Sequence, residues 1–172
     1  MKVFLLIGLP GSGKSTWAKN YVNQNENAII VSQDAFRYMI KGNNYIFDNK
    51  YEKFIKSATD LVIQEAIQHN FDLIVDETHI KKLRRLEVTN LINEIYMQYK
   101  YFHMDYSRVI DIIYLWFNEN NNLENRMKDD RGYTKDKWNE IIERMKAAFE
   151  PPTEDEHYKI IKINNPTECL DI

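Results

Sequence analysis

The chain has 172 residues, a formal net charge of −3 and 44% hydrophobic residues. This length and composition are ordinary for one globular domain and exclude a disordered, collagen-like or coiled-coil chain. A protein that binds polyanions over its whole surface would be strongly basic, so contact with nucleic acid would need a local patch. The only cysteine is Cys169, which excludes an internal disulfide and fits a cytoplasmic protein. No apolar run reaches the roughly 18 residues that span a bilayer, so we expect no membrane partner.

Apolar runs bounded by polar residues predict five buried strands. These are residues 3–7, 28–31, 71–75, 99–104 and 158–163. Apolar residues at helical spacing predict helices over 15–23, 51–68, 83–97, 107–117 and 135–149. Strands that alternate with helices indicate a parallel sheet with helices on its faces. We therefore predict one α/β domain over residues 1–172, a three-layer sandwich with a central parallel sheet of about five strands.

A glycine-rich loop follows the first predicted strand and precedes the first predicted helix. Residues 8–15, Gly-Leu-Pro-Gly-Ser-Gly-Lys-Ser, match the phosphate-loop pattern G-x-x-x-x-G-K-[ST] in full. Glycines let successive backbone N–H groups turn toward an anion, and the following helix presents its positive end to that anion. We expect Lys14 to reach the β- and γ-phosphates of ATP and Ser15 to bind Mg²⁺. The predicted ATP-binding residues are Gly8, Pro10, Gly11, Ser12, Gly13, Lys14, Ser15 and Thr16, and the predicted fold is that of a P-loop NTPase.

Two acidic residues, Asp76 and Glu77, end the predicted strand over 71–75. A carboxylate at the end of a strand beside a phosphate loop can hold the Mg²⁺ shell. Asp76 is therefore the candidate metal residue together with Ser15, and the choice between Asp76 and Glu77 stays open. A plain surface turn after the strand is the alternative. No two histidines have metal-ligand spacing, so we expect no metal other than Mg²⁺.

Asp34 and Arg37 follow the second predicted strand, at the edge where open parallel sheets bind ligands. A carboxylate there can accept the proton of an acceptor hydroxyl, so we predict Asp34 as the catalytic base of a small kinase. It can also be the N-cap of a helix, and the two roles are compatible. Arg37 shares the helical face of Asp34 and suits an anionic acceptor. A GTPase is disfavoured, because no guanine-reading N-K-x-D motif is found.

Cationic residues occur in two further segments. We predict a helical lid over roughly 126–136, in which Arg126 and Arg131 are catalytic, because phosphoryl transfer needs cations over the transferred group. A solvated helix end is the alternative, and we assign Lys128 to solvent. Lys81, Lys82, Arg84 and Arg85 follow the Asp76 turn. We expect Arg84 and Arg85 to bind acceptor phosphates, with a solvated helix start as the alternative.

These motifs, in this order, resemble the kinase domain of polynucleotide 5′-hydroxyl kinases and their P-loop kinase relatives. The matching segments are 13–18, Asp34 with Arg37, 76–79, Arg126 with Arg131, and 149–154 (Phe-Glu-Pro-Pro-Thr-Glu). The resemblance implies that Asp34 is the general base, that Arg37 binds the acceptor phosphate, and that Glu77 and Thr78 bind substrate. His79 departs from the pattern, in which asparagine is usual.

We therefore predict ATP- and Mg²⁺-dependent phosphorylation of the 5′-hydroxyl end of a polynucleotide or oligonucleotide. One alternative is a kinase of a small metabolite or nucleoside, which the acidic pI of about 5.8 mildly favours. Another is a nucleotide-dependent regulatory module with slow ATP hydrolysis, against which the pairing of Asp34 with Arg37 argues. The choice of DNA or RNA, the preference for ATP or GTP, and the oligomeric state stay open.

Overall fold

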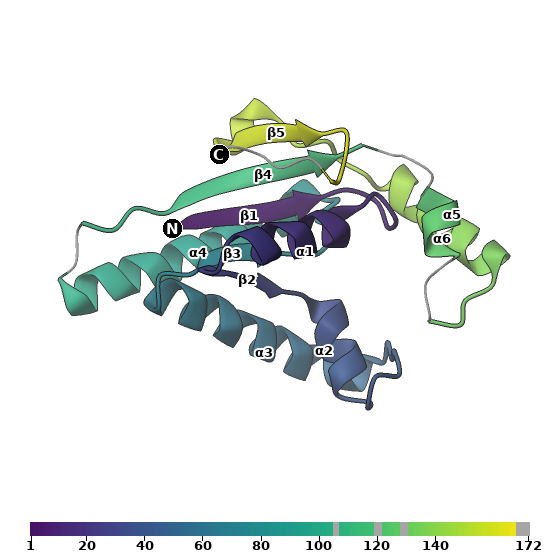
Figure 1. The fold of residues 1–172 in the computed structure, drawn as a ribbon, viewed down its shortest axis with the longest axis horizontal. Helices are drawn as coiled ribbons and strands as arrows, with labels where there is room; N and C mark the ends of the chain where they lie inside the picture. The colour runs from purple at the N-terminus through teal and green to yellow at the C-terminus, as the bar shows by residue number, and fades with distance from the viewer. Residues whose placement is uncertain (105–106, 119–121, 128–130, 168–172) are drawn as a thin grey trace.

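The centre of the molecule is a five-stranded sheet whose neighbouring strands all pair in parallel (Figure 1). The computed structural model describes residues 1–104, 107–118, 122–127 and 131–167. The strand order is β2-β3-β1-β4-β5, so β1 lies in the middle, between β3 and β4. The strands are β1 (Lys2–Ile7), β2 (Ala28–Val31), β3 (Asp72–Val75), β4 (Asp111–Phe117) and β5 (Lys159–Ile163). The predicted parallel sheet of about five strands is confirmed.

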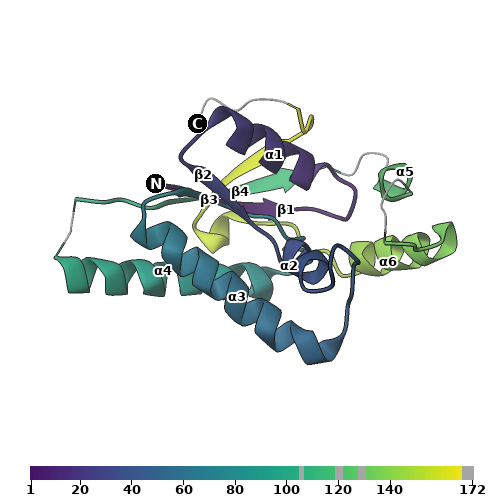
Figure 2. The ribbon, with the colours of Figure 1, turned by 60° about the horizontal axis from the view of Figure 1, so that its bottom comes forward.

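Helices cover both faces of this sheet, which gives three layers. Figure 2 shows α1 on one face and α3 with α4 on the other. Side chains alternate along β1: Phe4 and Leu6 pack with Trp17 of α1, whereas Val3, Leu5 and Ile7 join the core beneath α3 and α4. The helices are α1 (Lys14–Gln24), α2 (Gln33–Met39), α3 (Asn49–Gln68), α4 (Lys82–His103), α5 (Asn122–Arg126), α6 (Lys135–Ala147) and a short 3₁₀ helix, η1 (Glu154–Glu156).

Two predicted elements are wrong, and they are neighbours in the chain. Residues 107–117 were expected to form a helix, but 111–117 form β4. This strand is paired on both sides and buried on both faces, so its apolar run lacks the alternation that marks a half-buried strand. Residues 99–104 were expected to form a strand, but α4 continues to His103. Their aromatic residues favour strands only by propensity, and Tyr101 and Phe102 are exposed on the helix.

Some sequence predictions fall on residues outside the described ranges. They concern Cys169, Lys128 and the part of the expected lid that spans residues 128–130. Within the described ranges, no helix is both long and apolar enough to cross a membrane.

Candidate active site

The phosphate loop connects the carboxyl end of β1 to α1 and is fixed to the turn after β3. The backbone N–H of Gly8 donates a hydrogen bond of 3.0 Å to the carbonyl oxygen of Thr78. Gly11 and Gly13 have φ angles of 83° and 93°, the left-handed region that favours glycine. A Cβ on Gly13 would lie 2.6 Å from the Cβ of Pro166, so the chain after β5 also packs against this loop. The loop backbone is therefore held in a conformation that needs glycine.

Lys14 is buried inside the loop, whereas Ser15 and Thr16 are exposed at the start of α1. The ammonium group of Lys14 donates hydrogen bonds to the carbonyl oxygens of Gly8, at 2.9 Å, and Leu9, at 2.8 Å. Burial lowers the pKa of Lys14 to about 8, although the negative charge of Asp76 acts to raise it. The predicted phosphate-binding lysine is thus held beside the backbone that would bind the same anion.

Asp76 lies at the end of β3 and is hydrogen-bonded to Ser15. Burial raises the pKa of the Asp76 carboxyl, while the hydrogen bond from Ser15 and the charge of Lys14 act to lower it. A hydroxyl and a carboxylate are oxygen ligands of the kind that Mg²⁺ prefers. A half-buried carboxylate whose ionised form is disfavoured would gain from a nearby cation, so this donor pair fits the metal that P-loop kinases use. Among the described residues, no group of three or more His, Cys, Asp or Glu side chains could hold a metal.

The carboxylate of Asp34, on α2, is bound by two arginines and a tyrosine. Its Oδ1 accepts from Arg37 Nη1 at 2.6 Å and from the Tyr45 hydroxyl at 3.1 Å, and its Oδ2 accepts from Arg131 Nη2 at 2.7 Å. Burial acts to raise the pKa of Asp34, but the charges of Arg131 and Arg37 outweigh it and lower the pKa. Asp34 is therefore ionised and oriented at neutral pH. It is not the N-cap of α2, because that position is Ser32.

Arg37 is held by Glu52, a residue that sequence reasoning missed. Arg37 donates from Nε and Nη2 to the two Glu52 carboxylate oxygens, at 3.1 Å and 2.6 Å, which is the two-bond geometry of a strong pair. Gln33 accepts a further bond of 3.2 Å, and the ring of Phe47 lies 5.1 Å from the guanidinium carbon. Glu52 is 15 residues from Arg37 across a loop, a separation that no helical or strand spacing would single out.

Arg131 lies beside Asp34, and Arg126 lies near the lysine of the phosphate loop. The guanidinium carbon of Arg131 lies 4.1 Å from the Tyr45 ring centre and 5.6 Å from that of Trp138, and Arg126 lies 5.3 Å from Trp138. On α5, the amide of Asn125 donates a 2.8 Å hydrogen bond to the Gly11 carbonyl oxygen. The charge of Arg126 also acts to lower the pKa of Lys14, so the two groups are within electrostatic reach.

The turn after Asp76 carries Glu77, Thr78 and His79. Burial raises the pKa of Glu77, and the charge of Arg84, 3.3 Å away, acts to lower it. His79 is buried with a φ of 42°, and its Nδ1 lies 2.8 Å from the carbonyl oxygen of Leu6. Since a carbonyl only accepts, Nδ1 carries the proton; burial lowers the pKa of His79 to about 3 and keeps the ring neutral. The residue that departs from the expected pattern therefore fixes this turn to β1.

The prediction that Arg85 binds the acceptor is wrong. Its side chain is fully buried and forms an ion pair of 2.6 Å with Glu156, which is equally buried. It also donates to the carbonyl oxygens of His79 and Glu150, at 3.0 Å and 2.9 Å. Arg84, one residue earlier, faces Glu77 and remains about one third exposed. Arg85 joins the start of α4 to the 149–156 segment.

The fold and the groups gathered at this edge of the sheet define a P-loop kinase. The AAA domain family matches residues 3–152, and the chain belongs to that family. A curated relative is the L-seryl-tRNA(Sec) kinase of Methanococcus maripaludis, 30% identical over 96 residues, which are 54% of this chain and 36% of that protein. The chain thus spans only about a third of that relative's length.

Solved structures share the same fold. A chain of the Pnkp1/Rnl/Hen1 complex is 26% identical, with a TM-score of 0.54 over 77% of this chain and 40% of that one. A fungal RNA kinase is 11% identical, with a TM-score of 0.67 over 99% of this chain and 78% of that one. Small-molecule kinases, among them a sugar kinase, also have this fold. The predicted resemblance to P-loop kinases of the polynucleotide kinase type is confirmed, and kinases of small molecules share the same architecture.

Proposed function

We propose that residues 1–172 act as one kinase domain that transfers the γ-phosphate of ATP to the 5′-hydroxyl end of a polynucleotide or oligonucleotide. The observation that carries the proposal is the ionised Asp34 carboxylate, held by Arg37 and Arg131 at the edge of the sheet that carries the phosphate loop. A hydroxyl acceptor that bears a phosphate on its 3′ side needs a carboxylate and a cation side by side. The similarity to an L-seryl-tRNA(Sec) kinase supports a hydroxyl carried by RNA.

The phosphate loop binds ATP. The backbone N–H groups of residues 13–16, where the loop meets α1, and the ammonium of Lys14 bind the β- and γ-phosphates. Ser15 and Asp76 would hold Mg²⁺, which would neutralise part of the negative charge of the phosphates. When ATP binds, Lys14 exchanges its hydrogen bonds to the carbonyl oxygens for hydrogen bonds to the phosphates. The new bonds are stronger because the phosphate oxygens are charged and the carbonyl oxygens are not.

The transfer step uses Asp34 and the lid arginines. The acceptor oxygen forms a bond to the γ-phosphorus while the bond from that phosphorus to the β–γ bridging oxygen breaks, and the hydroxyl proton passes to Asp34. Because the pKa of Asp34 is lowered, its main contribution is to orient the hydroxyl for in-line attack. Arg126 and Arg131 stabilise the charge on the transferred group, and Arg37, fixed by Glu52, contacts the acceptor phosphate.

A kinase of a nucleoside or small metabolite is the second candidate. The observation that favours it is the pairing of Arg37, whose charge is already shared between Asp34 and Glu52. A paired guanidinium attracts a phosphate less strongly than a single cation does. A neutral acceptor would bind this site without breaking either pair.

The experiment that tests the proposal offers ATP and Mg²⁺ with 5′-hydroxyl RNA and DNA oligonucleotides, matched 5′-phosphorylated oligonucleotides, free nucleosides and a set of sugars. We expect phosphate transfer to the 5′-hydroxyl oligonucleotides and none to the 5′-phosphorylated ones. The Michaelis constant for the oligonucleotide should rise with salt concentration, since phosphate contacts release counterions. Transfer to sugars or nucleosides alone would replace the proposal with the second candidate.

A further inference from the structure

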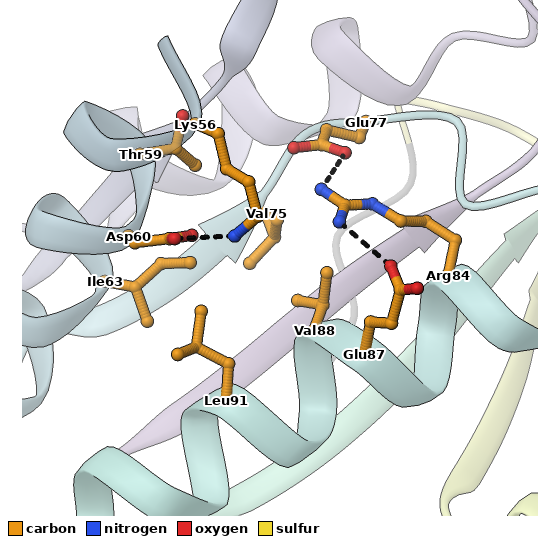
Figure 3. A pocket seen from close by; sticks show the side chains of 10 residues that line it. All are labelled: Lys56, Thr59, Asp60, Ile63, Val75, Glu77, Arg84, Glu87, Val88 and Leu91. Carbon is orange, nitrogen blue, oxygen red and sulfur yellow. Dashed lines mark hydrogen bonds and ion pairs between the residues drawn. The ribbon is translucent and has the colours of Figure 1, made fainter. Parts of the chain in front are cut away.

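A pocket of about 230 Å³ lies between α3 and α4, beside the turn that follows β3 (Figure 3). Its inner wall is apolar and consists of Ile63 on α3, Val75 on β3, and Val88 and Leu91 on α4. No residue of the phosphate loop lines it. The pocket is smaller than the range of about 300–1,000 Å³ typical of sites for drug-sized ligands, so it suits a single ring system.

Charged side chains face one another across the mouth of this pocket, as Figure 3 shows. On α3, Lys56 pairs with Asp60 at 2.6 Å. On the opposite side, Arg84 lies 3.3 Å from both Glu77 and Glu87. Each side thus presents a cationic donor next to a carboxylate acceptor, and both cations are already paired. Such a rim has little preference for a phosphate or a free cation. It fits a neutral, flat group with alternating donors and acceptors along its edge.

Glu77 connects the pocket to the transfer site. It directly follows Asp76, the candidate metal residue, and lines the pocket. The residue after Glu77, Thr78, accepts a hydrogen bond of 3.0 Å from the backbone N–H of Gly8, so the turn that carries Glu77 lies against the phosphate loop. In a nucleoside, the base is one sugar ring away from the 5′ oxygen. An acceptor whose 5′ oxygen meets Asp34 can therefore extend its base toward this pocket.

We infer that the pocket binds the terminal nucleobase of the acceptor. The inference rests on the proposed function. The apolar wall contacts the faces of the base, and Arg84 with Glu77 reads its edge by hydrogen bonds. The predicted substrate contacts of Glu77 and Arg84 are then made with a base and not with the phosphate backbone. The rim pairs also make the pocket selective. A base that covers a rim carboxylate or guanidinium without a hydrogen bond to it binds less tightly, because that group loses its water and gains no partner.

Binding of nucleosides, measured without any transfer, tests this inference. The full chain is saturated with a non-hydrolysable ATP analogue and Mg²⁺, so that the donor site is blocked, and adenosine, guanosine, cytidine and uridine are titrated by NMR. Leu91→Trp fills the pocket, and Asn90→Trp, on the exposed side of the same helix, is its control. We expect at least one nucleoside to bind, and Leu91→Trp to weaken this binding by about tenfold or more, about 1.4 kcal/mol, because the indole takes the space of the base.

Arg84→Met provides a second variant whose fold is not at risk, since Arg84 is partly exposed. It should weaken binding and change the order of preference among the four nucleosides. Equal nucleoside affinity in the wild type and Leu91→Trp, or no nucleoside binding at all beside the blocked donor site, would overturn the inference. If oligonucleotides are phosphorylated normally by Leu91→Trp, the pocket is wrong while the proposed function stands. If nucleosides bind the pocket but oligonucleotides are not phosphorylated, the proposed polynucleotide activity is wrong.

Discussion

The buried pair between Arg85 and Glu156 makes the strongest quantitative prediction about stability. The Arg85 guanidinium meets both Glu156 oxygens, at 2.7 Å and 2.6 Å, and three backbone carbonyls, and both side chains are fully buried. In Arg85→Met the Glu156 carboxylate stays buried without its partner. Loss of one member of a buried pair costs about 3–5 kcal/mol of unfolding free energy, and this is the decrease that we expect.

Urea unfolding of the nucleotide-free chain, followed by circular dichroism, measures this decrease. Glu156→Gln should destabilise the chain in the same sense. The double variant Arg85→Met/Glu156→Gln should lose less than the two single variants added together, because it leaves no unpaired charge. Arg84→Met is the matched control on the same helix, with a change below about 1 kcal/mol. Wild-type stability of Arg85→Met, together with a raised Michaelis constant for the acceptor, would refute the structural role and restore Arg85 to the acceptor site.

Three further predictions concern the site itself. ATP affinity should fall as pH rises above about 8, by up to about tenfold per pH unit. The reason is that the pKa of Lys14 in the free protein is lowered to about 8, and the phosphates bind its charged form. Calorimetry between pH 7 and 9.5 measures the change in ATP affinity. Glu52→Gln should raise the Michaelis constant for the acceptor several-fold, which corresponds to about 1 kcal/mol of binding free energy, and leave the Michaelis constant for ATP unchanged. The reason is that the charged pair that fixes the position of Arg37 is lost. Gly13→Ala should weaken ATP binding by about tenfold or more, because its φ is 93° and the added Cβ meets Pro166.

Matched controls separate these effects from general damage. Lys14→Met should bind ATP weakly at every pH, and a pH dependence that persists in this variant would assign the titration to another group. Glu65→Gln, an exposed position on α3, should leave both Michaelis constants unchanged; a parallel rise of both in Glu52→Gln would contradict a role confined to the acceptor. Gly42→Ala has a left-handed φ of 59° and no neighbour within 4 Å, so its ATP affinity should stay normal. An equal loss in Gly42→Ala would mean that crowding by Pro166 is not the cause.

The phosphate loop, the neighbouring acidic turn and the parallel sheet could be predicted because each rests on local spacing. Residues 8–15 form the loop directly between a strand and a helix, and Asp34 and Asp76 each follow a strand that ends at the same edge. β4 was missed because it is buried on both faces, so its residues carry no period that separates a strand from a buried helix.

The charge partners of the site could not be predicted, since they come from distant parts of the chain. Glu52 holds Arg37 across 15 residues, and Glu156 holds Arg85 across 71. Arg84 and Arg85 are adjacent and chemically identical, yet one faces the pocket rim and the other is buried. Only the packing of α4 against the 149–156 segment distinguishes them, and no pattern of residue types records that packing.

Transfer of labelled γ-phosphate from ATP to a 5′-hydroxyl oligonucleotide by the wild type and Asp34→Asn tests the central claim most directly. The variant should bind ATP with wild-type affinity but transfer phosphate about 10²–10⁴-fold more slowly, because its neutral amide neither orients the hydroxyl as the carboxylate does nor accepts its proton. The product of the wild-type reaction should carry the labelled phosphate on the 5′ oxygen of the oligonucleotide. Near-normal transfer by Asp34→Asn would contradict the role of Asp34, and label on no oligonucleotide in the wild type would contradict the polynucleotide acceptor.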